Sequence, residues 1–120
     1  MELEVRVTNY DGDLEELGKV YQEVTGTPYE SKSFDETDGI SFLLNRGGSG
    51  YSLSAIRWTI EPSYNLVLTA FGNDAQVSRE VIDEFAQITG LKPMEAPAYL
   101  REQLENQMAK SQLVFALLDL

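Results

Sequence analysis

The chain of 120 residues carries twenty acidic and nine basic side chains, which gives a net charge of −11, and 42 % of its residues are hydrophobic. This length and composition predict one folded domain spanning residues 1–120 and argue against a disordered chain. The absence of cysteine and histidine excludes a disulfide framework and removes the usual ligands of zinc, copper, haem and iron–sulfur clusters. The negative charge disfavours nucleic acid and anionic membranes as partners, and it favours cations or basic proteins.

The sequence predicts neither a targeting segment nor a membrane segment. The first seven residues, MELEVRV, lack a basic region followed by a long apolar run, so we expect no signal peptide. The longest apolar stretch, Leu113–Leu118, has six residues, whereas a membrane-spanning helix needs about 20. We therefore expect a soluble, cytoplasmic protein.

The first third of the chain predicts a strand followed by a helix. Residues 2–7 alternate between polar and apolar side chains, which is typical of a half-buried strand. Asp13 and Glu16 form a D-x-x-E capping pattern, and apolar residues then recur at helical spacing up to Val24. Gly26 predicts the end of this helix, because glycine readily adopts the left-handed conformation found there.

The remainder predicts a sheet followed by two helices. Three strands at about 40–45, 51–60 and 65–71 form an antiparallel meander, a helix follows at about 77–89, and a last helix begins at residues 96–97. The predicted order is β-α-β-β-β-α-α. It indicates the α+β class, with an antiparallel sheet of about four strands packed by three helices.

The residues that could support catalysis are few. Paired carboxylates such as Asp35 and Asp38 perform acid–base chemistry where an apolar pocket raises the pKa of one of them, but these two lie in the most polar segment of the chain. No serine occurs in a nucleophile-elbow pattern. The glycine-rich stretch at 45–50 precedes a strand, whereas a phosphate-binding loop precedes a helix. We therefore expect no enzyme.

Two predicted loops, NYDGD and SFDETDG, carry carboxylates beside a glycine. Calcium takes roughly six to eight oxygen ligands from carboxylates, amides, backbone carbonyls and water, and a glycine lets the chain curl around the ion. Neither loop has the spacing of an EF-hand. The sequence therefore predicts a calcium site of another kind, with the candidate ligands Asp11, Asp13, Asp35, Glu36 and Asp38.

The direction of the first strand decides whether these two segments meet. If strand 2–8 pairs antiparallel with strand 40–45, its end brings the first acidic segment to the second. If it runs the other way, Asp11 falls near Asn73 and Asp74 and the cluster disperses. Carboxylates that meet without a cation repel one another and raise each other's pKa, and bound calcium would neutralise them.

The same residues also have plainer interpretations. Asp13 is a candidate helix cap as well as a candidate ligand. The carboxylates at 35–38 are equally typical of a surface loop. The helix residues Glu15, Glu16 and Glu23 are interpreted as solvated surface.

A small, single-domain, strongly acidic chain that contains NYDGDLEE and SFDETDG and lacks an EF-hand resembles the calcium-binding protein family of heterocyst-forming cyanobacteria. The resemblance covers the whole chain and rests on length, acidity and these two segments. It implies a cytoplasmic calcium buffer with its ligands on the acidic surface, and Asp38 is the first candidate among them.

A second hypothesis is an acidic protein-interaction module, such as an inhibitor, an immunity protein or a nucleic-acid mimic, that docks on a basic partner. Residues 1–38 hold eleven acids and three bases, so most of the negative charge lies in this part of the chain. This hypothesis predicts binding that weakens with salt and that depends on Glu15, Glu16 and Glu23. The calcium hypothesis predicts instead that these three residues are replaceable and that Asp38→Ala prevents binding.

Overall fold

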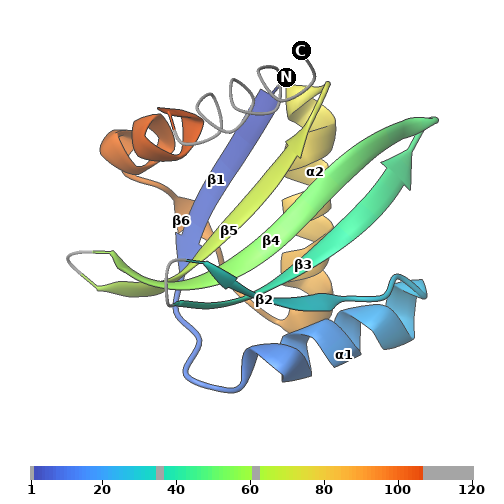
Figure 1. Cartoon of the computed structure of the whole chain (residues 1–120), viewed down its shortest axis with the longest axis horizontal. Coiled ribbons are helices and arrows are strands. Elements are labelled where there is room, and N and C mark those ends of the chain that lie inside the picture. Colours follow the sequence, from blue (N-terminus) through green and yellow to red (C-terminus); the bar gives the residue numbers. More distant parts are fainter. Residues whose placement is uncertain (1, 35–36, 61–62, 107–120) are drawn as a thin grey trace, which may run out of the picture.

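The computed structural model of the chain describes residues 2–34, 37–60 and 63–106. Within these residues, six strands form one antiparallel sheet in the order β2-β3-β4-β5-β1-β6 (Figure 1). The strands are β1 (Glu2–Thr8), β2 (Glu30–Phe34), β3 (Thr37–Arg46), β4 (Ser49–Ile60), β5 (Tyr64–Gly72) and β6 (Met94–Glu95). The helices are α1 (Leu14–Thr25) and α2 (Ala75–Thr89), and residues 98–106 are also helical. The predicted α+β class and the antiparallel sheet are confirmed.

The prediction of about four strands is wrong, because two further strands lie at the edges of the sheet. Within residues 2–34, 37–60 and 63–106, β2, with the sequence ESKSF, pairs only with β3, and the two residues of β6 pair only with Arg6 and Val7 of β1. An edge strand has one partner and can be short or polar, so it lacks the apolar pattern that marks an inner strand. The predicted loop SFDETDG therefore consists of the end of β2 and the start of β3, with residues 35–36 outside the described part.

α1 begins and ends at the signals that the sequence predicts, and α2 has caps of the same kind. Asp13 caps α1 by accepting a hydrogen bond from the N–H of Glu15 at 3.0 Å, and Asp74 caps α2 in the same way. Gly26 and Gly90 follow the two helices with φ angles of 76° and 79°, which is the left-handed conformation that favours glycine. No helix in the described part of the chain is long and apolar enough to cross a membrane.

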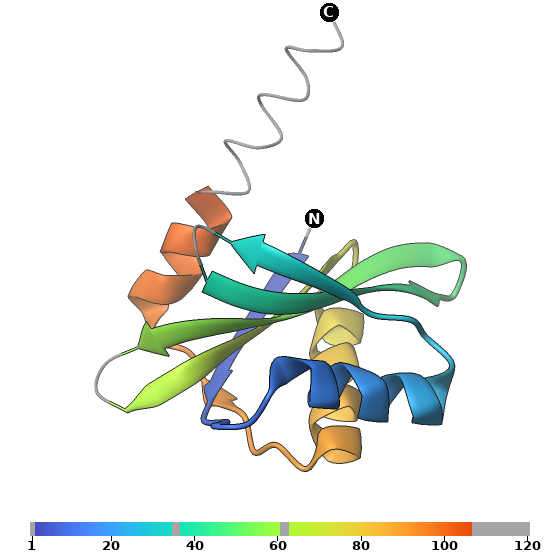
Figure 2. The same cartoon turned by 60° about the horizontal axis from the view of Figure 1, so that its bottom comes forward.

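Two hydrophobic layers cover the two faces of the sheet (Figure 2). On one face, α1 and α2 pack over the strands, and the rings of Tyr21, Phe42 and Phe85 contact one another with centroids 4.7, 5.3 and 5.7 Å apart. On the other face, the helix that follows β6 contributes Leu100 and Leu104 to a smaller cluster. The start of α1 lies beside one end of the strands.

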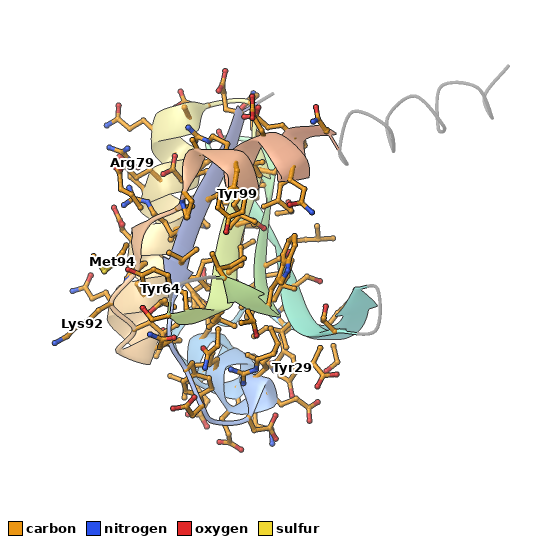
Figure 3. The ribbon with its side chains drawn as sticks, turned by 90° about the vertical axis from the view of Figure 1, so that its left-hand side faces the viewer. Tyr29, Tyr64, Arg79, Lys92, Met94 and Tyr99 are labelled. Carbon is orange, nitrogen blue, oxygen red and sulfur yellow. The ribbon has the colours of Figure 1, made fainter. Side chains whose placement is uncertain are left out.

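Two tyrosines contact neighbouring elements at the borders of these layers (Figure 3). Tyr29 lies against α1, and a Cβ atom added at Gly18 would be 2.6 Å from the Cγ atom of its ring. Tyr64 donates a hydrogen bond from its hydroxyl to the sulfur atom of Met94 in β6, at 3.4 Å. The first contact packs the chain that connects α1 to β2 against the helix.

The direction of β1 brings the two acidic segments to the same end of the sheet. β1 pairs with β5, not with β3, and Thr8 lies opposite Leu66 at the start of β5. Every neighbouring pair from β3 to β1 is antiparallel, so β1 still runs opposite to β3. The end of β1 therefore lies where β3 begins. This is the direction in which the prediction brings the two acidic segments together, although β1 pairs with β5 and not with the strand at 40–45.

Candidate functional site

The loop between β1 and α1 closes around the side chain of Arg57, which projects from β4. Its guanidinium group donates one hydrogen bond from Nη1 to the carbonyl oxygen of Tyr10 and another from Nη2 to that of Gly12, the latter at 2.6 Å. The guanidinium carbon lies 5.8 Å from the centroid of the Tyr10 ring, a distance typical of a cation–π contact. Two backbone oxygens of the NYDGD segment therefore face a positive charge that the chain itself supplies.

Asn65 at the start of β5 fixes the other side of this loop. Its side-chain oxygen accepts a hydrogen bond from the N–H of Tyr10 at 2.8 Å, and its side-chain amide donates one to Asp11 at 2.9 Å. Its own backbone N–H donates to the side-chain oxygen of Asn9 at 3.1 Å. The alternating oxygens of the loop are therefore directed partly to β5, and Asp11 is engaged there.

A cavity of about 520 Å³ lies between the N-terminus of α1, the starts of β2 and β3, and the last part of β4. Its charged lining residues are Asp13, Glu15, Asp38 and Arg57. The remaining lining residues are Leu14, Ser31, Gly39 and Ile40. Three residues with carboxylates and one with a guanidinium group line the cavity, so the lining has an excess of two negative charges.

The carboxylates at this cavity differ in whether they already accept hydrogen bonds from other groups of the protein. One oxygen of Asp13 caps α1, and one oxygen of Glu15 accepts a hydrogen bond from the hydroxyl of Ser31 at 3.0 Å. Asp38 is exposed, and no hydrogen bond or ion pair within the described residues engages its carboxylate. Leu14 and Ile40, by contrast, are only 5 % and 1 % exposed and form an apolar floor. The site therefore combines an acidic rim with an apolar base.

The structure brings together only part of the predicted ligand set. Asp13 and Asp38 line the same cavity, although they are separated by 25 positions in the chain. Asp11 lies outside the lining and contacts Asn65. Asp35 and Glu36 lie outside the described residues. The prediction that the two acidic segments meet is therefore supported for one residue from each.

Three lining residues with polar or charged side chains were not among the sequence candidates. Glu15 was interpreted as solvated helix surface, yet the first turn of a helix capped by Asp13 necessarily places it near the same loop. Ser31 reaches the cavity because it pairs with Ile40 across β2 and β3, a register that requires knowledge of the edge strand. Arg57 is reached through the long-range contact of β4 with the β1–α1 loop, and no local pattern indicates it.

The donor set gives calcium only an incomplete site. Within the described residues, no group of three or more acidic side chains is arranged to hold a metal ion together. Arg57 also places a positive charge in the cavity, which opposes the binding of a cation nearby. The calcium site therefore stays a prediction, and it would need Asp13, Glu15 and Asp38 to be joined by further oxygens.

Comparisons of the chain with protein-family models, with curated proteins and with solved structures find no match. The geometry of the cavity and the charge around it are therefore the basis for a functional proposal.

Proposed function

We propose that this protein is an acidic interaction module that docks on a basic protein through its acidic face. The acidic face comprises the exposed carboxylates of the cavity and of α1, which are Asp13, Glu15, Glu16, Glu23 and Asp38. The observation that carries the proposal is the cavity itself, whose acidic rim surrounds a base formed by Leu14 and Ile40.

The composition of the cavity suits the side chain of lysine or arginine better than a bare ion. Such a side chain has a cationic head and an aliphatic stem. Carboxylates can bind the head while Leu14 and Ile40 contact the stem. The volume of about 520 Å³ is in the range of pockets that accept organic groups. The neighbouring NYDGD loop already has Arg57 as its cation.

The charge along α1 extends the same surface. Glu16 and Glu23 are exposed, and Lys19 lies 3.8 Å from Glu16 as a weak surface ion pair. Like charges on one face repel one another, and a basic partner relieves that repulsion on binding. The expected signature is fast association that slows steeply as salt is added.

Titration with an oligolysine peptide tests this proposal. The triple variant Glu15→Gln, Glu16→Gln and Glu23→Gln removes three charges from the acidic face. The matched control Glu80→Gln, Glu95→Gln and Glu102→Gln removes three exposed charges from α2, β6 and helix 98–106. Both variants have the same net charge, so a difference between them reports where the charges lie. We expect the first variant to bind the peptide at least about tenfold more weakly than the control, because its lost charges belong to the acidic face. Equal affinities of the two variants would overturn the proposal.

Calcium binding is a second candidate function. The observation in its favour is that Asp38, whose carboxylate has no partner within the described residues, shares a cavity with Asp13 and Glu15. A site this open should bind more weakly than the tightest calcium buffers, and magnesium should compete poorly because it resists giving up its water. The calcium-buffer role implied by the resemblance and a cytoplasmic location belong to this proposal.

Calorimetric titration of chelator-treated protein in about 0.15 M salt separates the two candidates. The calcium proposal expects saturable heat that survives excess magnesium, disappears in Asp38→Ala and persists in Glu16→Gln with Glu23→Gln. The interaction proposal expects Glu16→Gln with Glu23→Gln to weaken binding of the oligolysine peptide. It also expects calcium to leave the affinity for this peptide unchanged. If calcium gives no saturable heat and no shift in Tm, the calcium candidate is rejected.

A further inference from the structure

α1 carries two exposed valines beside its acidic residues. Val20 and Val24 are 39 % and 64 % exposed, whereas Leu17 and Tyr21 on the same helix are 3 % and 0 % exposed. Residues four positions apart lie on one side of a helix, one turn from each other. The two valines therefore form an apolar pair at the exposed edge of the buried stripe of α1.

Nothing in the packing of the described residues requires valine at these two positions. The hydrophobic core under α1 is formed by residues that are nearly fully buried, and neither valine belongs to it. Valine also has a lower helix propensity than alanine or the long charged residues, because its branched side chain loses rotamer freedom in a helix. The two valines therefore disfavour the helix locally, and in the free protein they gain only part of the stabilisation that full burial would give.

The charges around the pair indicate what kind of surface would cover it. Glu16 lies four positions before Val20 and Glu23 lies three positions after it, so both carboxylates neighbour Val20 on the helix surface. An apolar contact bordered by carboxylates is complementary to an apolar strip bordered by lysine or arginine. Residues at i and i+4 form a ridge on a helix surface, and such a ridge packs into the groove between side chains of another helix.

We propose that Val20 and Val24 are the apolar contact of the acidic face, and that the partner presents an amphipathic basic helix to them. This inference rests on the proposed docking of a basic protein and specifies the partner's chemistry. Charge then supplies the orientation and the rate of encounter, while the valine pair favours an amphipathic partner over one that is merely basic.

Two peptides with the same number of lysines test the inference: oligolysine, and a leucine–lysine peptide patterned as an amphipathic helix. We expect the wild-type protein to bind the amphipathic peptide about tenfold more tightly, the scale of gain that burial of small apolar side chains supplies. Val20→Gln with Val24→Gln should reduce its affinity to that of oligolysine and leave oligolysine binding unchanged. Glutamine keeps the helix propensity high.

Leu43→Thr provides the matched control, because Leu43 on β3 is 83 % exposed and lies outside α1. This variant should retain the wild-type preference for the amphipathic peptide. The inference is overturned if the valine double variant keeps that preference, or if Leu43→Thr loses it equally. The proposed docking function is tested separately. It fails if oligolysine binding does not depend on Glu15, Glu16 and Glu23, whatever the valine variant shows.

Discussion

The Nη2 atom of Arg57 lies 2.6 Å from the carbonyl oxygen of Gly12, and the two residues are 45 positions apart in the chain. This contact joins β4 to the loop that precedes α1. It turns a segment with the oxygen pattern of an ion-binding loop into one that surrounds a guanidinium group. Arg57 also lines the cavity next to Asp13 and Asp38, so the same side chain influences both the stability of the loop and the charge of the candidate site.

Replacing Arg57 should therefore have a measurable effect on stability. Arg57→Gln removes a charged donor to two backbone oxygens, and we expect the free energy of unfolding to fall by about 1.5–3 kcal/mol. Urea unfolding measures the change. Arg79→Gln is the control, since Arg79 is 55 % exposed and its distance of 3.9 Å from the Glu4 carboxylate is long for an ion pair. This variant should lose less than about 1 kcal/mol of stability. Equal losses would show that the loop does not depend on Arg57.

The same substitution also tests the calcium candidate. Removal of the guanidinium group makes the cavity more negative by one charge, so a calcium ion bound there should bind more tightly in Arg57→Gln than in wild type. About a tenfold gain corresponds to roughly 1.4 kcal/mol of relieved repulsion. Calorimetry at one fixed salt concentration measures it. An affinity that stays the same or falls would place any calcium site away from this cavity.

The meeting of Asp13 and Asp38 was predictable in part, and the role of Arg57 was not. Helix caps and strand directions follow from local patterns and from antiparallel pairing, so the ends of the two acidic segments could be placed from the sequence. Arg57 lies where the register between β4 and β5 shifts before Ile60. Its contacts depend on tertiary packing between distant segments, which no local spacing encodes.

Gly18 allows a test of the packing between α1 and the chain that leads to β2. Alanine normally stabilises a helix by about 1 kcal/mol relative to glycine, but its Cβ would lie 2.6 Å from the Cγ atom of Tyr29. We expect Gly18→Ala to lower Tm in spite of the better propensity, because the ring must move. In the background Tyr29→Ala, the same substitution should raise Tm. A stabilising effect in both backgrounds would mean that the ring moves at no cost.

The inner strands and the two long helices were predictable because each has an apolar period that the core imposes. Ile40, Phe42 and Leu44 alternate along β3 on the side that α1 and α2 cover. β2 and β6 have no such pattern in their sequences, and each pairs with a single strand within the described residues. Their existence depends on hydrogen bonds to a neighbouring strand, which hydrophobic periodicity does not report.

Glu4 connects three parts of the fold through arginine residues. Its carboxylate is 11 % exposed and lies 3.0 Å from Arg6, 3.3 Å from Arg101 and 3.9 Å from Arg79. Glu4→Gln should lower the free energy of unfolding by about 2–4 kcal/mol, because it leaves guanidinium groups without their common partner. Glu2→Gln, at an exposed position of the same strand, should change it by less than about 0.5 kcal/mol. Similar losses in the two variants would contradict this role.

Tyr21 gives the protein a dependence on alkaline pH. Its burial, together with the nearby carboxylate of Glu84, raises the pKa of the hydroxyl to about 12 from 10.0. A group whose pKa is higher in the folded state contributes stability that is complete below the unfolded pKa and is lost as the pH rises through the folded value. The contribution of Tyr21 should therefore be complete below pH 10 and disappear as the pH approaches 12.

Tyr21→Phe isolates this contribution, because every other titrating group is shared with the wild type. At pH 8 the variant should be less stable by about 1 kcal/mol, since it lacks the hydrogen bond to Glu84. Between pH 10 and 12 the wild type should lose stability faster than the variant, so the difference between them should shrink and then reverse. Urea unfolding of both proteins across this range measures it. A difference that stays constant with pH would show that ionisation of Tyr21 is not coupled to unfolding.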